Sequence, residues 1–222
     1  MKIVISRRVA IGAAVAVNLV LLLALVLLTL SRSDNRRADE LRQLGATEYP
    51  EPAQIADFAL MDQSGNAFGI DRLQDRWSLV FFGFTSCDDI CPLSVVEMNR
   101  AIESLQNPRL QAIFVTVDPA IDTPALLGSY LAAFNDSWIG LTGDMGSIQR
   151  LASQLYVVIR NQQTDVAAER DMAAHGEHDE SHGGDIDHSG HISLIDPQGR
   201  LRAVLRPPHR SRDLVAIMEY FL

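Results

Sequence analysis

The sequence is short of cysteine, because its 222 residues include only Cys87 and Cys91. Two cysteines are too few for a disulfide-stapled scaffold, and a chain of this length can build a core that needs no staple. A pair only four positions apart is therefore expected to be redox-active or metal-binding. Two unrelated buried thiols are the plain alternative.

Basic residues are also in deficit. The net charge is −9, and residues 1–30 contribute Lys2, Arg7 and Arg8 without any acid, so the rest of the chain carries −12. Phosphate binding needs a basic surface, so this balance argues against nucleic acid as a partner. An acidic body suits cationic ligands or basic protein patches, although acidity more often serves solubility.

Charged residues are missing altogether from Val9 to Leu30. Twenty-two helical residues span about 33 Å, enough for a hydrocarbon core of about 30 Å. A cleavable signal peptide has a shorter apolar region and an A-x-A-like site, neither of which is present. Basic residues flank both ends, so orientation is inferred from the very short N-terminal tail. We expect residues 1–30 to be a single-pass anchor in a bacterial-type inner membrane, with the soluble domain in the periplasm.

The remaining residues predict one linker and one domain. Residues 31–54 are polar and end in a proline-containing stretch, which is typical of a tether. Residues 55–222 suit a single domain with its own core. Phe58–Asp62 and Ala67–Ile70 flank Gln63–Asn66, a pattern that predicts a β-hairpin at the front of this domain.

Beyond this hairpin, apolar patterns alternate between strand and helix. Two continuous apolar runs predict buried strands, and helical periods and a final hairpin follow. The expected strands are Ser78–Phe84, Gln111–Val117, Tyr156–Arg160, His191–Asp196 and Leu201–Leu205, and the expected helices are Pro92–Leu105, the segment after Thr123, Met145–Leu155 and Ser211–Leu222. This order predicts an α/β, thioredoxin-like fold: a central mixed β-sheet flanked by helices, with an N-terminal β-hairpin extension and an N-terminal transmembrane helix.

The two cysteines lie where a buried strand turns into a helix, and in α/β sheets sites form at such strand ends. If the loop winds helically from Asp88, Cys87 and Cys91 face the same way, and the helix dipole stabilises their thiolates. Asp88 and Asp89 penalise a fast thiolate nucleophile but favour a bound cation. Three intervening residues also depart from the C-x-x-C redox motif. On residues alone, metal binding and disulfide exchange both remain open.

The sequence around and beyond this motif resembles the Sco/SenC family of copper proteins. The likeness spans Ile55 to Leu222 and rests on ordered blocks: Phe82–Cys87, Cys91-Pro92, Phe114–Pro119, Asp122–Pro124, Leu141–Gly143, and Asp187–Ser189 before Asp196-Pro197. The resemblance implies a thioredoxin fold with copper held by Cys87, Cys91 and His188. It also implies a role in maturing the binuclear copper centre of cytochrome c oxidase.

Two functions follow from this resemblance and from the thiol pair. In the first, a membrane-anchored metallochaperone receives copper from an upstream donor, or is kept reduced by a thiol reductant, and delivers the ion to the copper-bearing oxidase subunit. In the alternative, Cys87 and Cys91 are the catalytic redox pair of a thiol–disulfide oxidoreductase that reduces the oxidase subunit or another exported target. Copper binding requires His188, whereas simple disulfide exchange does not. A peroxide-reducing enzyme is a third reading, but no feature of the sequence marks a peroxide pocket.

Histidines cluster near the C-terminal end of a His-, Asp- and Glu-rich insertion at about residues 161–187, which has no apolar period and is expected at the surface. Five lie within seventeen residues: His175, His178, His182, His188 and His191. The first three predict either a solvated loop or a weak auxiliary site for a divalent ion. His191 is a further auxiliary candidate and the competitor of His188 for third ligand.

The expected metal follows from the donor atoms. Two thiolates and one imidazole favour Cu(I), and one more oxygen ligand would let the site hold Cu(II) as well. Zinc accepts the same atoms and is the competing ion. Asp187 is expected to orient the His188 imidazole. His209, between Pro208 and Arg210, is expected to be an ordinary surface residue.

Overall fold

The computed structural model describes the backbone of residues 7–87, 90–161 and 186–222 and the side chains of 16–28, 36–87, 92–159 and 189–222. The chain divides into two compact units, Met1–Gln43 and Leu44–Leu222. The first unit is helix α1 (Arg7–Gln43), which contains the uncharged run. Among the described residues, no helix combines the length and the apolar character needed to cross a membrane.

The second unit is built on a mixed sheet. In the described part of the chain its strands lie in the order β1-β10-β9-β4-β5-β6-β2-β3. Strands β4, β5 and β6 are parallel, whereas β9 and β10 run antiparallel to their neighbours. The bounds are β1 (Ala46–Gln54), β2 (Leu60–Asp62), β3 (Ala67–Phe68), β4 (Trp77–Gly83), β5 (Leu110–Thr116), β6 (Ile139–Thr142), β9 (Ile192–Ile195) and β10 (Arg200–Leu205).

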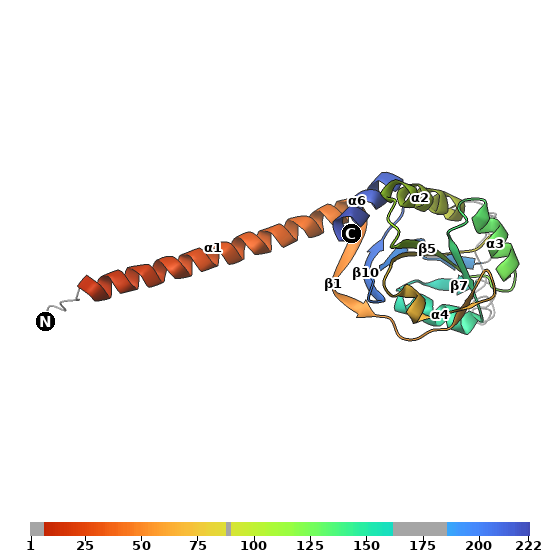
Figure 1. Cartoon of the computed structure of the whole chain (residues 1–222), viewed down its shortest axis with the longest axis horizontal. Coiled ribbons are helices and arrows are strands. Elements are labelled where there is room, and N and C mark those ends of the chain that lie inside the picture. Colours follow the sequence, from red (N-terminus) through yellow and green to blue (C-terminus); the bar gives the residue numbers. More distant parts are fainter. Residues whose placement is uncertain (1–6, 88–89, 162–185) are drawn as a thin grey trace, which may run out of the picture. The chain divides into compact units, whose positions relative to one another are not determined.

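The sheet forms because its central strands are apolar on both faces. Every residue of β5, and all of β4 except Trp77, is buried, as expected of strands covered on both sides. Figure 1 shows α2 (Ile90–Leu105) and α6 (Ser211–Phe221) on one side of the sheet and α4 (Met145–Gln154) on the other. The remaining helices are η1 (Ile70–Leu73) and α3 (Pro124–Ala132).

The order of elements confirms the predicted thioredoxin-like arrangement, since β4, α2 and β5 are followed by the hairpin β9–β10 and by α6. The predicted front hairpin is also present as the antiparallel pair β2–β3. Its turn is closed by Asp62, whose carboxylate accepts hydrogen bonds from the backbone N–H groups of Ser64 and Asn66, both at 2.9 Å. Gly65 adopts the left-handed conformation that this turn requires (φ +81°).

The expected linker differs from the structure in one respect. Residues 46–54 form strand β1, which pairs with β10 from Ala46 opposite Leu205 to Gln54 opposite Arg200. The prolines that suggested a tether lie where the register shifts, between Glu48 and Ala53. Proline is tolerated there because β1 is an edge strand. The compact unit therefore begins at Leu44 rather than at Ile55.

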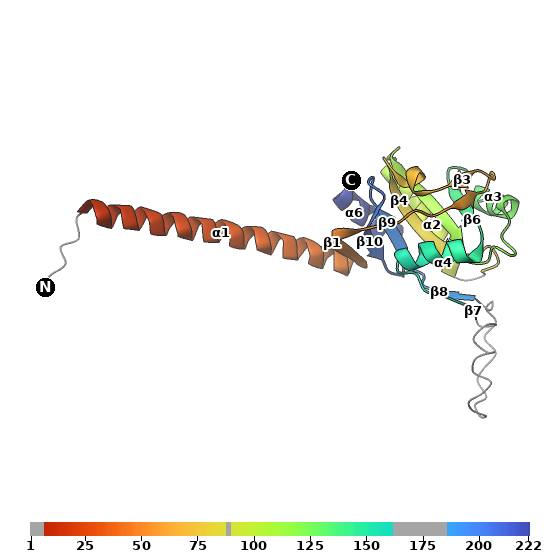
Figure 2. The ribbon, with the colours of Figure 1, turned by 90° about the horizontal axis from the view of Figure 1, so that it is seen from below.

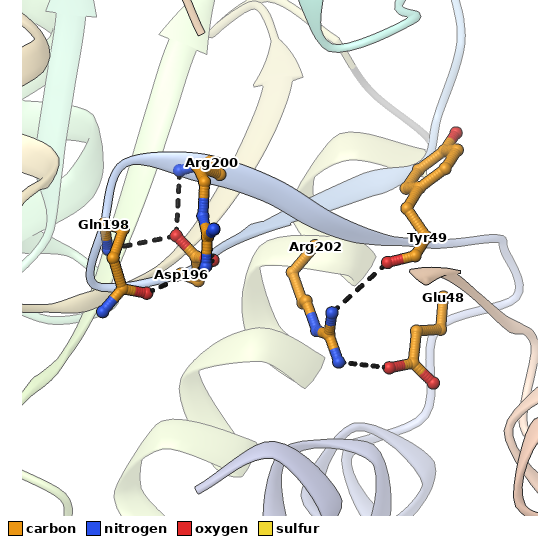
Figure 3. Close-up of polar contacts among 6 residues, drawn as sticks. All are labelled: Glu48, Tyr49, Asp196, Gln198, Arg200 and Arg202. Carbon is orange, nitrogen blue, oxygen red and sulfur yellow. Dashed lines mark hydrogen bonds and ion pairs between the residues drawn. The ribbon is translucent and has the colours of Figure 1, made fainter. Parts of the chain in front are cut away.

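Polar contacts fasten β1 and shape the neighbouring turn (Figure 3). The guanidinium of Arg202 donates to the Glu48 carboxylate at 2.5 Å and to the Tyr49 carbonyl at 3.3 Å. In the β9–β10 turn, Asp196 accepts from the backbone N–H groups of Gln198 and Arg200, both at 3.0 Å. The two contacts of Arg202, together with the pairing of β1 with β10, explain why β1 belongs to the domain.

We predict that a chain beginning at Ile55 is less stable than one beginning at Leu44. Removing β1 uncovers Leu201 and Leu205, which are at most 1 % exposed, and opens the edge of β10. The free energy of unfolding should fall by about 2–4 kcal/mol, measured by urea denaturation. Equal stabilities for the two chains would show that β1 is only a tether.

Candidate metal centre

The cysteine-bearing segment leaves the sheet at the end of β4. Cys87 is a half-buried free thiol that packs against the core, and its backbone N–H donates to the Phe84 carbonyl at 3.3 Å. Helix α2 begins at Ile90, so the backbone of Cys91 lies in its first turn. The side chain of Cys91, and the predicted helical winding through Asp88 and Asp89, lie outside the described residues.

A buried carboxylate fixes the start of this segment. Asp122 is fully buried and accepts hydrogen bonds from the backbone N–H and the hydroxyl of Thr85, the former at 3.0 Å. It also accepts from the hydroxyl of Thr116 at 2.6 Å. Thr85 precedes Cys87 by two residues and Thr116 ends β5, so Asp122 ties the cysteine segment to the neighbouring strand.

Sequence reasoning missed this role for Asp122. The Asp-Thr-Pro triplet predicts a helix start, and Thr123 is indeed the N-cap of α3, accepting from the Leu126 N–H at 3.3 Å. Because the side chain of Thr123 caps the helix, the carboxylate of Asp122 is not needed for capping and can accept other hydrogen bonds. The presence of a second polar residue beside the cap was the local sequence signal for this additional role.

The histidine-bearing segment reaches the same edge of the sheet by topology. Strand β9 runs antiparallel to β4, with Ile192 opposite Phe81, so the chain enters β9 near the end at which it leaves β4. His188 lies four residues before Ile192, so its segment leads into β9 at the strand end where the chain leaves β4 toward Cys87.

The backbone of His188 differs in one detail from the predicted loop. It belongs to strand β8 (Ile186–His188), which forms a two-stranded ribbon with β7 (Ile159–Asn161), seen below α4 in Figure 2. In this ribbon His188 lies opposite Ile159, and Asp187 lies opposite Arg160. The expected strand Tyr156–Arg160 is correspondingly shorter, because β7 begins only at Ile159.

Two further histidines contact backbone groups in the segments that flank this ribbon in the sequence. The Nε2 atom of His191 lies 3.1 Å from the carbonyl oxygen of Leu155. The Nε2 atom of His209 lies 2.8 Å from the carbonyl oxygen of Gly190. Burial lowers the pKa of both imidazoles, because it disfavours the charged form. The expectation that His209 is an ordinary surface residue was wrong, since its ring is half-buried and edge-on to Phe81.

The described side chains do not by themselves assemble a metal centre. Among them, no three His, Cys, Asp or Glu residues lie close enough together to hold an ion. Of the three predicted ligands only Cys87 has a described side chain, and His175, His178 and His182 lie outside the described residues. The pairing of β4 with β9 nevertheless places the strand end that leads to Cys87 beside the strand start that follows His188, and a set of two thiolates and an imidazole suits a soft metal ion.

The fold, with a thiol pair at the junction of strand and helix, defines a thioredoxin-like protein. The model of the SCO1/SenC family matches residues 46–222, and the chain belongs to that family. The chain is also 34 % identical to a Stutzerimonas stutzeri protein named for copper binding. The aligned 207 residues cover 92 % of this chain and 93 % of that protein.

Solved structures share the fold. The apo Sco1 protein from Thermus thermophilus superposes with a TM-score of 0.64 at 30 % identity, covering 80 % of this chain and 96 % of that one. ScoI from Bradyrhizobium japonicum, solved with copper bound, gives 0.61 at 27 % identity, covering 77 % and 100 %.

Replacing Asp122 by Asn should loosen the cysteine segment. An amide accepts through one oxygen only and leaves buried donors without a charged partner, so the free energy of unfolding should fall by about 2–3 kcal/mol. Alkylation of Cys87 by iodoacetamide should become faster. The matched control is Asp136→Asn, which changes an exposed carboxylate and should alter neither quantity. Unchanged stability and alkylation in Asp122→Asn would refute the anchoring role.

Proposed function

We propose that this chain binds copper through Cys87, Cys91 and His188 and delivers it to the copper-bearing subunit of cytochrome c oxidase. The observation that supports the proposal is the antiparallel pairing of β9 with β4: the chain enters β9, shortly after His188, at the strand end where it leaves β4 toward Cys87. Membership of the SCO1/SenC family and the copper bound in the Bradyrhizobium japonicum relative support the choice of metal.

The local structure suits thiolate ligands. Cys91 lies in the first turn of α2, where the unpaired N–H groups and the helix dipole favour negative charge. Two thiolates and one imidazole form a soft set that favours Cu(I), and an added oxygen ligand would accommodate Cu(II). Asp187 would hold the His188 ring in one orientation.

Delivery follows from the small number of ligands. A three-ligand set leaves room for a donor atom of the oxidase subunit, so the ion can pass by stepwise ligand exchange. The thiols must be reduced before loading, which calls for an upstream copper donor or a thiol reductant. Copper is the cargo in this scheme, and the chain supplies the ligands and the docking site.

Thiol–disulfide exchange is the second candidate function. Cys87 is a free thiol that is only partly covered, so it is accessible to a target disulfide. In that reaction Cys87 and Cys91 become oxidised to a disulfide while a target disulfide is reduced to two thiols. His188 has no part in this chemistry, and this difference separates the two functions.

Single substitutions test the ligands. Cys87→Ser and Cys91→Ser should each abolish tight Cu(I) binding, because a hydroxyl is a poor ligand for a soft metal. His188→Ala should weaken binding more than His191→Ala does, measured by competition with a chromophoric Cu(I) chelator. A larger loss in His191→Ala would transfer the third ligand to His191.

The His188→Ala variant also separates delivery from disulfide exchange. It should still reduce a target disulfide, because both thiols remain, yet fail to mature the oxidase copper centre at limiting copper. The two readouts are a disulfide-reduction assay and oxidase activity in cells. Full oxidase activity in this variant would favour the thiol–disulfide enzyme.

We further propose that α1 anchors the chain in a bacterial-type inner membrane. The large apolar side chains described between Val17 and Leu28 are 51–66 % exposed, an apolar surface that lipid would cover. The uncharged run extends from Val9 to Leu30, about one membrane thickness of helix. The soluble unit would then lie in the periplasm, where it would contact the copper-bearing subunit of the oxidase.

A reporter fused after Leu222 tests this arrangement. Alkaline phosphatase needs disulfides that form outside the cytoplasm, so its fusion should be active if the C-terminus lies in the periplasm. β-Galactosidase fused at the same point is the matched control and should be inactive. The reverse pattern would place the domain in the cytoplasm and would count against delivery to the oxidase.

A further inference from the structure

His209 connects two parts of the chain that are distant in sequence. It lies between β10 and α6, and its Nε2 atom is 2.8 Å from the carbonyl oxygen of Gly190. Its ring packs edge-on against the buried ring of Phe81, with centroids 6.4 Å apart at 88°. Gly190 lies two residues after His188, so this contact holds the segment that leads away from the predicted third ligand.

The hydrogen bond defines which ring nitrogen carries the proton. A carbonyl oxygen only accepts, so Nε2 of His209 must donate. Burial lowers the pKa of His209, as does the neighbouring His191, while the bond to Gly190 opposes the shift. The side chain therefore acts as a neutral imidazole that offers Nε2–H to Gly190.

Other contacts tie the same segment to the opposite side of the domain. Ser189 donates its N–H to the Val158 carbonyl at 3.0 Å, and its hydroxyl accepts from the Val158 N–H at 3.1 Å. The Nε2 atom of His191 lies 3.1 Å from the Leu155 carbonyl. Leu155 is the C-cap of α4, and Val158 immediately precedes β7, so these contacts join the segment to that part of the domain. His209 instead joins it to the connection that precedes α6.

The connection that carries His209 also reaches the cysteine-bearing helix. The backbone N–H of Ser211, at the first position of α6, donates to the Glu97 carboxylate at 2.6 Å. Glu97 belongs to α2, the helix whose first turn contains Cys91. The bond from Ser211 is the largest cause of the lowered pKa of Glu97, so this carboxylate is a charged acceptor at neutral pH.

We propose that His209 is a positioning residue of the metal centre, which sets the place of the His188 segment relative to the cysteine-bearing helix through Gly190 on one side and the Ser211–Glu97 contact on the other. The inference rests on the proposed copper site. His209 is hydrogen-bonded to the carbonyl of Gly190, and its effect on the metal passes through that backbone group.

The test compares three variants of the whole chain in detergent. His209→Ala removes the donor and should weaken Cu(I) binding about tenfold in competition with a chromophoric chelator, the usual effect of one lost hydrogen bond. His209→Gln places an amide N–H near the position of Nε2 and should retain most of the affinity. His209→Asn carries the same amide on a shorter side chain, so it should behave like His209→Ala.

A second measurement separates positioning from a general loss of structure. In a His188→Ala chain the residue that His209 positions is gone, so adding His209→Asn should change Cu(I) affinity less than twofold. Equal losses in the two backgrounds, or equal affinities of the Gln and Asn variants, would overturn the inference. A wild-type chain that binds no Cu(I) would instead overturn the proposed copper site itself. In the metal-free chain, ¹⁵N NMR of the His209 ring should show Nε2 protonated at neutral pH, and the opposite tautomer would also contradict the inference.

Discussion

Strand β4 pairs in parallel with β5 on one side and antiparallel with β9 on the other, and the candidate metal centre depends on this mixed pairing. The chain leaves β4 toward Cys87 at the edge where it enters β9 after His188. A parallel β9 would place His188 at the far end of the strand, roughly 20 Å away at about 3.3 Å per residue. A short-range ligand set drawn from both segments therefore requires the antiparallel strand.

Pairing alone brings the two segments to one edge without fixing where the loops lie, and buried polar groups supply that second constraint. Asp122 holds Thr85 and Thr116 together, and a carboxylate with neutral donors in a dry environment forms stronger hydrogen bonds than an uncharged group would. His209 holds the segment after His188 through the carbonyl of Gly190, and Glu97 of α2 holds the start of α6 through the N–H of Ser211. None of these side chains is a predicted ligand. Asp122 and His209 are hydrogen-bonded to segments that carry a predicted ligand, and Glu97 belongs to the helix that carries Cys91.

The elements with strong apolar patterns could be predicted from the sequence because runs of apolar residues are expected to be buried. Strands β4 and β5 are buried on both faces and read as continuous apolar runs, and the N-cap Thr123 precedes a proline as a helix start should. Strand β1 was not predicted because prolines disfavour a strand. They are tolerated here because β1 lies at the edge of the sheet, a position that the sequence does not reveal. Strand β8 escaped because its three residues have no period of their own, and their pairing with β7 is non-local.

The sequence by itself determined which chemistry the chain can offer: two thiols at a junction of strand and helix, a histidine before a strand, and an order of elements that matches one family. Tertiary structure alone decided what the isolated polar residues do. Asp122 looked like part of a helix cap and His209 like a surface residue, but the structure buries the first completely, half-buries the second and gives both partners far along the chain. The role of a polar side chain depends on its burial and on the group opposite it, and neither quantity is encoded in the residues immediately around it.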